Sequence, residues 1–155
     1  MTKKRWLLLA LFMAAITAAD QITKAVVRAE IPVGHAVPVL PGIVQLTHVE
    51  NEGAAFSMLG GARWFFLVLV VLFFAGEALL IRRKYVTKAP ELWALAAISG
   101  GALGNAIDRA VSGTVTDMIE PLFIDFAVFN AADIFITCGA AALVVYVLFF
   151  DRKKE

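Results

Sequence analysis

Four long apolar segments limit what this chain can fold into. They comprise residues 6–19 with an extension to Val27, residues 64–81, residues 92–107 and residues 134–150. A helix that crosses a bilayer needs about 20 mostly apolar residues. The chain is 61% hydrophobic and only 17% charged, whereas soluble domains carry roughly 25% charged residues. The sequence therefore predicts an all-α membrane protein with four transmembrane helices.

The first apolar segment, taken alone, has a second interpretation. Lys3, Lys4 and Arg5 precede an apolar stretch that ends in small residues at Ala19, and this pattern is also typical of a secretory signal peptide. Three further apolar segments follow Ala19, rather than a soluble domain with paired cysteines. We therefore expect the first helix to be retained in the membrane.

The distribution of positive charge predicts the orientation of the helices. Ten of the 14 Lys and Arg residues lie within residues 3–5, 82–88 and 152–154. Because cytoplasmic loops carry an excess of Lys and Arg, we expect both termini in the cytoplasm of a multi-pass inner-membrane protein. Residues 29–62 and 108–132 then form the external segments.

The two external segments differ in character. Residues 43–49 alternate partly between apolar and polar side chains, which predicts a strand. Residues 54–59 favour a short helix or a segment lying along the membrane surface. Residues 123–129 are too apolar for a free loop, so we expect them to pack against protein or membrane.

Polar residues near the external ends of the apolar segments indicate a site close to the outer leaflet. Ionisable groups at membrane depth are costly unless they are paired or face a polar cavity, which makes them functional candidates. These polar residues are Asp20, Lys24, Asn51, Glu52, Asn105, Asp108, Arg109, Asp117, Glu120, Asn130 and Asp133.

Two patterns within the helices predict close contacts. Asp20 and Lys24 are four residues apart with the acid first, which favours an ion pair on one helix face. This pair either serves structure at the end of the span or contacts a substrate. Gly100 and Gly104 form a GxxxG pattern, which lets another helix or a ligand approach the backbone closely. Asn105 and Arg109 share a helix face, which suits either packing at the rim or a site.

Asp117 and Asp133 form the candidate pair of carboxylates. Asn130 is a good N-cap residue and places Asp133 at about the third helical position. Local pattern alone is equally compatible with helix capping by Asp133 and with an Asx-turn at Asp117. Catalysis by the pair is the alternative for both residues.

Other chemistries find little support in the sequence. It has no His-Glu-x-x-His motif and only one cysteine, Cys138, so a zinc site is not expected. A serine nucleophile elbow and a glycine-rich phosphate loop are also absent. His35 and His48 stand apart and are interpreted as loop residues. Because no basic patch is interleaved with aromatic residues, we expect no nucleic-acid partner.

Five short motifs together resemble the lipoprotein signal peptidase family, also called signal peptidase II. They occur in the family's order across most of the chain, and their combination is much more specific than any one of them. The motifs are DQITK at residues 20–24, NEGAAF at 51–56, GGALGNAIDR at 100–109, VTD at 115–117 and FNAAD at 129–133.

This resemblance implies a single membrane-embedded peptidase domain over residues 1–155. Such an enzyme removes signal peptides from diacylglyceryl-modified bacterial prolipoproteins and cleaves on the N-terminal side of the lipidated cysteine. It implies four transmembrane helices with a small external β-rich cradle and a short external helix. It also implies prolipoproteins and membrane lipids as partners, no metal or cofactor, and a monomer.

The resemblance assigns catalysis to Asp117 and Asp133, and it also implies a set of supporting residues. These are Asp20, Lys24, Asn51, Gly53, Gly101, Asn105, Asp108, Arg109, Asn130 and Ala132. The stretch between the two aspartates lacks the aromatic-rich insertion of some relatives, which leaves the shape of the outer rim undefined.

Two neighbouring carboxylates share one proton, because both cannot ionise cheaply. The helix dipole favours Asp133 as the ionised base, with Asp117 as the acid. One rival is a metal-dependent lipid phosphotransferase that uses Asp108 together with this pair. Another is an ion-coupled transporter, which predicts carboxylates near the midplane and often an inverted repeat; the sequence shows neither feature.

Overall fold

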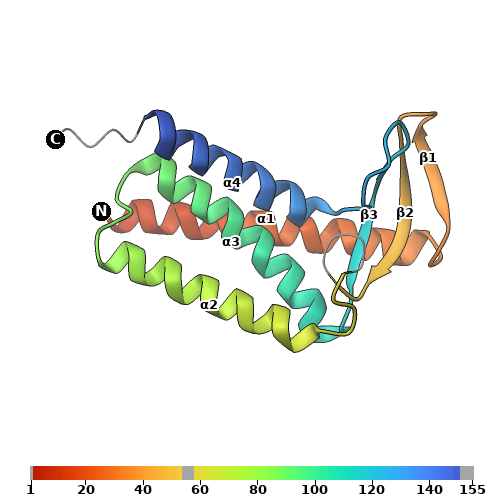
Figure 1. The fold of residues 1–155 in the computed structure, drawn as a ribbon, viewed down its shortest axis with the longest axis horizontal. Helices are drawn as coiled ribbons and strands as arrows, with labels where there is room; N and C mark the ends of the chain where they lie inside the picture. Colours follow the sequence, from red (N-terminus) through yellow and green to blue (C-terminus); the bar gives the residue numbers. More distant parts are fainter. Residues whose placement is uncertain (1, 54–57, 151–155) are drawn as a thin grey trace.

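The computed structural model describes residues 2–53 and 58–150 and consists of four helices and a small sheet (Figure 1). The helices are α1 (Lys3–Glu30), α2 (Arg63–Arg82), α3 (Ala89–Val111) and α4 (Ala131–Phe149). They run in alternating directions, so the start of α1, the end of α4 and the α2–α3 connection lie together at one end (Figure 1). The sheet lies at the opposite end of the bundle.

Helices α1, α2 and α4 are each long and apolar enough to cross a membrane. Helix α3 forms over the third predicted segment but is not among these candidate spans. It contacts all three other helices, and its glycine, serine and asparagine residues are buried between them. The protein is therefore mostly helical, with three apolar helices among the residues that the structure describes.

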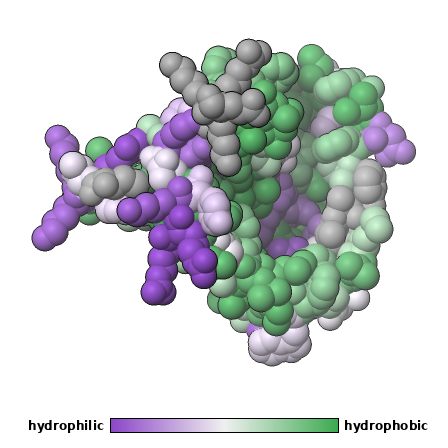
Figure 2. Space-filling view, turned by 60° about the vertical axis from the view of Figure 1, so that its left-hand side comes forward, coloured by the Kyte–Doolittle hydropathy of each residue, from purple (hydrophilic) through white to green (hydrophobic). Residues whose placement is uncertain are grey.

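Apolar side chains cover much of the outside of the bundle. Helix α2 packs against α3 and none of its own residues is buried. Trp64 and Val71 on α2 and Phe149 on α4 are 66–72% exposed, as expected for side chains that face lipid rather than water. Figure 2 shows hydrophobic side chains around a hollow in which hydrophilic side chains are visible.

Glycines bring α3 close to its neighbours. A Cβ atom on Gly100 would lie 2.9 Å from the Met13 carbonyl oxygen of α1, and one on Gly104 would collide with the Asp20 carboxylate. The close helix approach predicted for the GxxxG pattern is therefore confirmed, with α1 as the partner. Gly101 faces α4 in the same way, because its Cβ would collide with the Ala132 carbonyl oxygen.

We predict that Gly101→Ala lowers stability by about 1–3 kcal/mol, because a methyl group must push α3 and α4 apart. Gly76→Ala in α2 is the matched control, since no atom lies within 4 Å of its added Cβ and alanine favours a helix. Thermal unfolding in detergent measures both variants. Equal melting temperatures for the two would contradict the close packing of α3 on α4.

The sheet has three antiparallel strands in the order β1-β2-β3. They are β1 (Ala36–Leu40), β2 (Val44–Asn51) and β3 (Val115–Pro121). Strand β2 confirms the strand predicted at residues 43–49. The interpretation of Asp117 as a turn residue is wrong, because it lies within β3. Met118 of β3 packs with Val27 and Ile31 near the end of α1, which fixes the sheet on the bundle.

Two sequence-based expectations fall on parts of the chain that the structure does not describe. The predicted short helix at residues 54–59 includes residues 54–57, and the basic C-terminal stretch comprises residues 152–154; both lie outside the described residues. The apolar segment at residues 123–129 includes Phe129, which pairs with β3, whereas Phe123 is 67% exposed.

Candidate active site

Backbone pairing brings Asp117 and Asp133 into one region. After β3 the chain turns back, and Phe129 exchanges two backbone hydrogen bonds with Ile119, of 3.1 and 2.7 Å. This pairing puts Asn130 next to the strand that holds Asp117. Because α4 starts directly after Asn130, Asp133 in its first turn comes close to the strand as well.

The Asp117 carboxylate is buried and held by two amides. Its side chain accepts hydrogen bonds from Asn51 Nδ2 at 2.8 Å and from Asn130 Nδ2 at 2.7 Å, one on each oxygen. Asp117 is only 3% exposed. Burial raises the pKa of Asp117 to about 6, against the effect of the two amide hydrogen bonds, and the negative charge of Asp133 adds to the increase. This carboxyl group is therefore protonated in part near neutral pH.

Asp133 caps α4 and belongs to the same network. Its carboxylate accepts from the backbone N–H of Asn130 at 3.2 Å, while the Asn130 side chain accepts from the Asp133 N–H at 3.1 Å. The predicted capping geometry is confirmed. A third bond comes from Asn105 Nδ2 at 2.8 Å. Two donors and the positive end of a helix stabilise a carboxylate anion at this position.

Two asparagines connect the aspartates to each other. Asn130 Nδ2 donates to the Asp117 carboxylate and also lies 3.2 Å from Asn105 Oδ1. Asn105 in turn donates to Asp133. Asn130 is 0% exposed, so these amides act as rigid spacers inside the protein. The two carboxyl groups are thereby fixed in neighbouring positions from different elements, β3 and α4.

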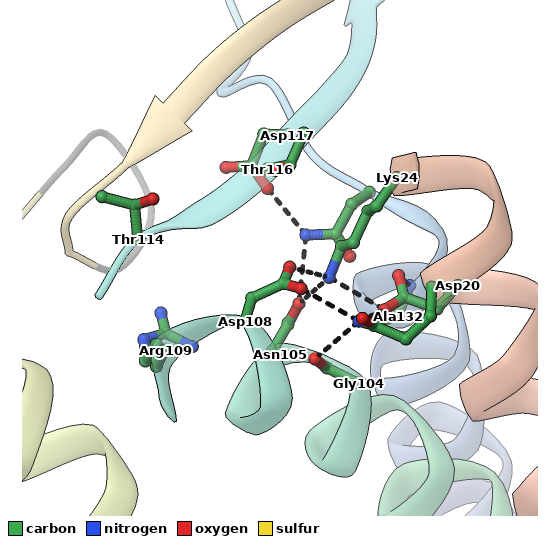
Figure 3. Close-up of polar contacts among 12 residues, drawn as sticks. Asp20, Lys24, Gly104, Asn105, Asp108, Arg109, Thr114, Thr116, Asp117 and Ala132 are labelled. Carbon is green, nitrogen blue, oxygen red and sulfur yellow. Dashed lines mark hydrogen bonds and ion pairs between the residues drawn. The ribbon is translucent and has the colours of Figure 1, made fainter. Parts of the chain in front are cut away.

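The buried ammonium group of Lys24 binds one of these amides, that of Asn105. Lys24 Nζ lies 2.8 Å from Asp20 Oδ2, Asp108 Oδ2 and Asn105 Oδ1 (Figure 3). The contact with Asn105 is a hydrogen bond, and the contacts with the two carboxylates are ion pairs. The predicted ion pair between Asp20 and Lys24 is confirmed, and Asp108 is a second partner. Lys24 and Asp20 are both 0% exposed.

The cluster ties α1 to α3 and α4. Asp20 Oδ1 accepts from the Ala132 N–H at 2.9 Å, which anchors the first turn of α4. Gln21 also takes part, because its Nε2 donates to Asp108 Oδ1 at 3.0 Å and to the Gly104 carbonyl at 3.1 Å. Gln21 was not among the predicted site residues, although it lies next to Asp20 in a motif that was singled out.

Arg109 hydrogen-bonds to the turn after β2, and its positive charge also acts on Asp117 and Asp133. Its guanidinium donates to the Gly53 carbonyl oxygen at 2.7 Å and lies 4.5 Å from the centre of the Phe66 ring. The Gly53 N–H donates to Asn51 Oδ1 at 2.9 Å, so the turn also orients the amide that binds Asp117. All predicted site residues thus belong to one connected region, with Gly101 packed beneath Ala132.

Two cavities open beside the aspartates. Asp117 and Asn51 line one of about 250 Å³. Asp133 lines the other, of about 350 Å³, together with Ile134, Thr137 and Cys138 of α4. The second cavity is almost entirely apolar, whereas the first has a mixed lining, to which Asn51, Asp117 and Asp125 contribute polar groups. The site can therefore receive a polar backbone next to a hydrophobic group.

The metal-dependent alternative required Asp108 to join Asp117 and Asp133. Asp108 instead faces Lys24 and Gln21. Within residues 2–53 and 58–150, no group of three or more His, Cys, Asp or Glu side chains is arranged to hold a metal ion. The geometry thus offers an acid–base pair more readily than a cation site.

Comparisons with known proteins show which family this chain resembles. Residues 12–149 match the family described as signal peptidase (SPase) II. Lipoprotein signal peptidases of Streptococcus pyogenes serotypes M5 (strain Manfredo) and M18 (strain MGAS8232) are each 42% identical over 148 residues, covering 92% of this chain and 93% of theirs. Two solved structures described as bacterial membrane enzymes give TM-scores of 0.87 and 0.82 at 26% and 28% identity. They cover 95% and 93% of this chain, and 92% and 94% of their own chains are matched.

Proposed function

The chain belongs to the signal peptidase II family, and we propose that it removes signal peptides from lipid-modified bacterial prolipoproteins by aspartic catalysis. The observation that supports this most strongly is the pairing of Asp117 and Asp133 through Asn130 and Asn105. The two carboxyl groups come from different elements, share one hydrogen-bond network and border two cavities.

In the proposed mechanism the pair shares one proton. Asp133, which two donors and a helix N-terminus stabilise, takes a proton from water. The resulting hydroxide attacks the scissile carbonyl carbon while protonated Asp117 donates to the carbonyl oxygen. The diol then collapses with the roles exchanged, because Asp117 takes a hydroxyl proton and Asp133 protonates the leaving amine. The raised pKa of Asp117 supports its role as the acid.

The two cavities suggest how a lipidated substrate lies. We assign the mixed cavity at Asn51 and Asp117 to the peptide backbone around the scissile bond, because its polar groups can pair with backbone amides. The apolar cavity along Ile134 and Thr137 suits the diacylglyceryl cysteine, whose chains remain in the bilayer. Cleavage would occur on the N-terminal side of that cysteine. Arg109 holds the turn at Gly53, which lies beside the peptide path.

We also propose that α3 is a fourth transmembrane helix of an inner-membrane enzyme. Its polar groups find partners within the bundle, including Ser99, whose hydroxyl donates to Glu77 at 2.7 Å. Residues 82–88 are basic and lie at the same end as the start of α1 (Figure 1). With that end in the cytoplasm, the aspartates lie near the outer leaflet.

The decisive experiment is incubation of the purified protein with a synthetic diacylglyceryl prolipoprotein peptide, followed by mass spectrometry. We expect a product that begins at the lipidated cysteine and no cleavage of the same peptide without its lipid. The rate should be unchanged in EDTA. A rate that vanishes in EDTA and returns with Mg²⁺ would favour the metal-dependent alternative, and an intact lipidated peptide would refute the proposed activity.

We predict that kcat/KM decreases as the pH rises above about 6. The active form has one proton on the pair, and the raised pKa of Asp117 is about 6. Above that pH the second carboxyl group ionises, so no acid remains to protonate the carbonyl oxygen. A profile of kcat/KM against pH, measured in detergent, checks this decrease on the alkaline side. A kcat/KM that stays the same from pH 5 to pH 9 would contradict a carboxyl group acting as the acid in the free enzyme.

A further inference from the structure

His48 is a buried residue of β2, so its interpretation as a loop residue is wrong. It is 4% exposed, and both ring nitrogens have close partners. Nδ1 lies 2.6 Å from the Ile31 carbonyl oxygen, and Nε2 lies 2.9 Å from Glu50 Oε1. Both partner oxygens can accept hydrogen bonds, so the ring contacts the end of α1 on one side and Glu50 on the other. His48 therefore links the end of α1 to Glu50.

Glu50 extends this link across the sheet to β3. Its carboxylate accepts from the hydroxyl groups of Thr114 and Thr116, the latter at 3.2 Å. Burial alone would raise the pKa of Glu50, but the hydrogen bonds from Thr114, His48 and Thr116 lower it below its usual value. Thr116 is 1% exposed and directly precedes Asp117. Glu50 thus holds the strand next to the catalytic aspartate.

A β-bulge explains why His48 points inward. Leu46 pairs with Ile119 and Val49 pairs with Asp117, so three steps along β2 match two steps along β3. The extra residue lies at 47–48, where the His48 N–H donates to the His35 carbonyl at 3.1 Å. Bulges bend a strand and redirect its side chains, often beside active sites. This bulge sets the register at Asp117.

We propose that His48 and Glu50 are positioning residues for Asp117. The proposal rests on the proposed function, because it concerns the same catalytic pair. His48 fixes the bulge against α1, and Glu50 holds β3 through Thr114 and Thr116. Together they keep Asn51, at the end of β2, in place to donate to the Asp117 carboxylate.

One further charged group from outside the sheet reaches this cluster. Arg28 of α1 donates to Thr116 Oγ1 at 3.0 Å and lies 3.7 Å from Asp108 Oδ1 (Figure 3 shows Thr116 and Asp108). Thr116 therefore receives from Arg28 and donates to Glu50. The hydrogen-bond chain from His48 runs through Thr116 toward the cluster around Lys24, so the two sides of Asp117 are braced together.

The test uses His48→Asn and Glu50→Gln in the lipopeptide assay. Asn at position 48 keeps a donor for the Ile31 carbonyl but cannot reach Glu50, and Gln removes the charge of Glu50 at constant shape. A misplacement of about 1 Å can cost about 100-fold in rate. We therefore expect kcat to decrease by about 10- to 100-fold in each variant, with KM within about twofold.

Two control variants separate positioning from general damage to the sheet. Glu120 accepts from Gln45 Nε2 at 2.7 Å across the same two strands, but at their far end. Glu120→Gln and His35→Asn should leave kcat unchanged, because neither side chain touches the cluster of His48 and Glu50. The kcat of each variant is measured on its monodisperse fraction in detergent. Misfolded protein is thereby excluded and cannot lower the measured kcat.

Two further readouts are specific to positioning. The hydrogen bond from the Asn51 side-chain amide lowers the pKa of Asp117, so its loss raises that pKa. In both variants the decrease of kcat/KM at alkaline pH should therefore begin at a higher pH. The double variant should lose no more activity than Glu50→Gln alone, because the two residues act in series. The positioning role would be overturned if both single variants had the wild-type kcat and the wild-type dependence of kcat/KM on pH. If Asp117→Asn also remained active, the proposed function itself would fail, which is a separate result.

Discussion

Replacement of either Asp117 or Asp133 by Asn is expected to reduce cleavage of a lipidated prolipoprotein peptide by about 10²- to 10⁴-fold. This is the range that general acid–base catalysis contributes. Asn has almost the shape of Asp but can neither release the shared proton nor accept one from water. At position 133 it can still accept the capping hydrogen bond from the Asn130 N–H, so helix α4 should form. Single-turnover mass spectrometry measures the loss.

A matched control comes from the same strand. Glu120→Gln changes a carboxylate three residues after Asp117, where its partner is Gln45, and should leave the rate unchanged. The double variant with Asn at both catalytic positions should be no slower than the slower single variant, because residues that act as one unit are not additive. Normal turnover by either single variant would exclude the dyad.

Lys24→Met is expected to cause the largest loss of stability. The substitution leaves the Asp20 carboxylate without a cation and the Asp108 carboxylate with only Arg28 at 3.7 Å, in a region where both acidic side chains are at most 2% exposed. Breaking a buried ion pair by removal of one partner costs about 3–5 kcal/mol. For a protein of this size that corresponds to a decrease of roughly 10 °C in melting temperature, measured by thermal unfolding in detergent.

Arg28→Met is the matched control for this effect. Arg28 also lies near Asp108, but at 3.7 Å and with 38% of its side chain exposed, so its ion pair should contribute at most about 1 kcal/mol. Adding Asp20→Asn and Asp108→Asn to Lys24→Met should recover part of the loss, since no unpaired charge then remains buried. A Lys24→Met variant as stable as the wild type would refute the structural role of the cluster.

The helices could be predicted from the sequence because membrane burial leaves a direct compositional signal. Apolar runs identified all four helices to within a few residues. The strands around the site were harder. In β3, residues 115–118 are all buried, so the apolar–polar alternation that reveals a half-buried strand is absent. Strand β1 contains Pro38 and is exposed throughout, which also hides it.

Local pattern could identify the residues of the site but not their roles. The spacing of Asp20 and Lys24 predicted an ion pair, whereas the contact of Lys24 with Asp108 joins residues 84 positions apart and leaves no periodic signal. For Asp133, the sequence pattern presents capping and catalysis as alternatives. In the structure its carboxylate caps α4 and also accepts from Asn105, so the capping role is compatible with the proposed catalytic one. His48 was wrongly interpreted as a loop residue because its burial depends on a β-bulge. That bulge arises from the pairing of β2 with β3, which local sequence does not reveal.

The return of the chain at Phe129 has a consequence for how this enzyme can diversify. The backbone pairing of Phe129 with Ile119 closes the loop between them, and Asn130, which follows directly after this closure, donates to Asp117. Residues 125–128 lie between these paired positions and line the cavity that Asp117 borders, whereas Asp117 and Asp133 are held by hydrogen bonds from Asn51, Asn105 and Asn130. We therefore expect substitutions within residues 125–128 to change which substrates fit while the carboxyl groups keep their positions.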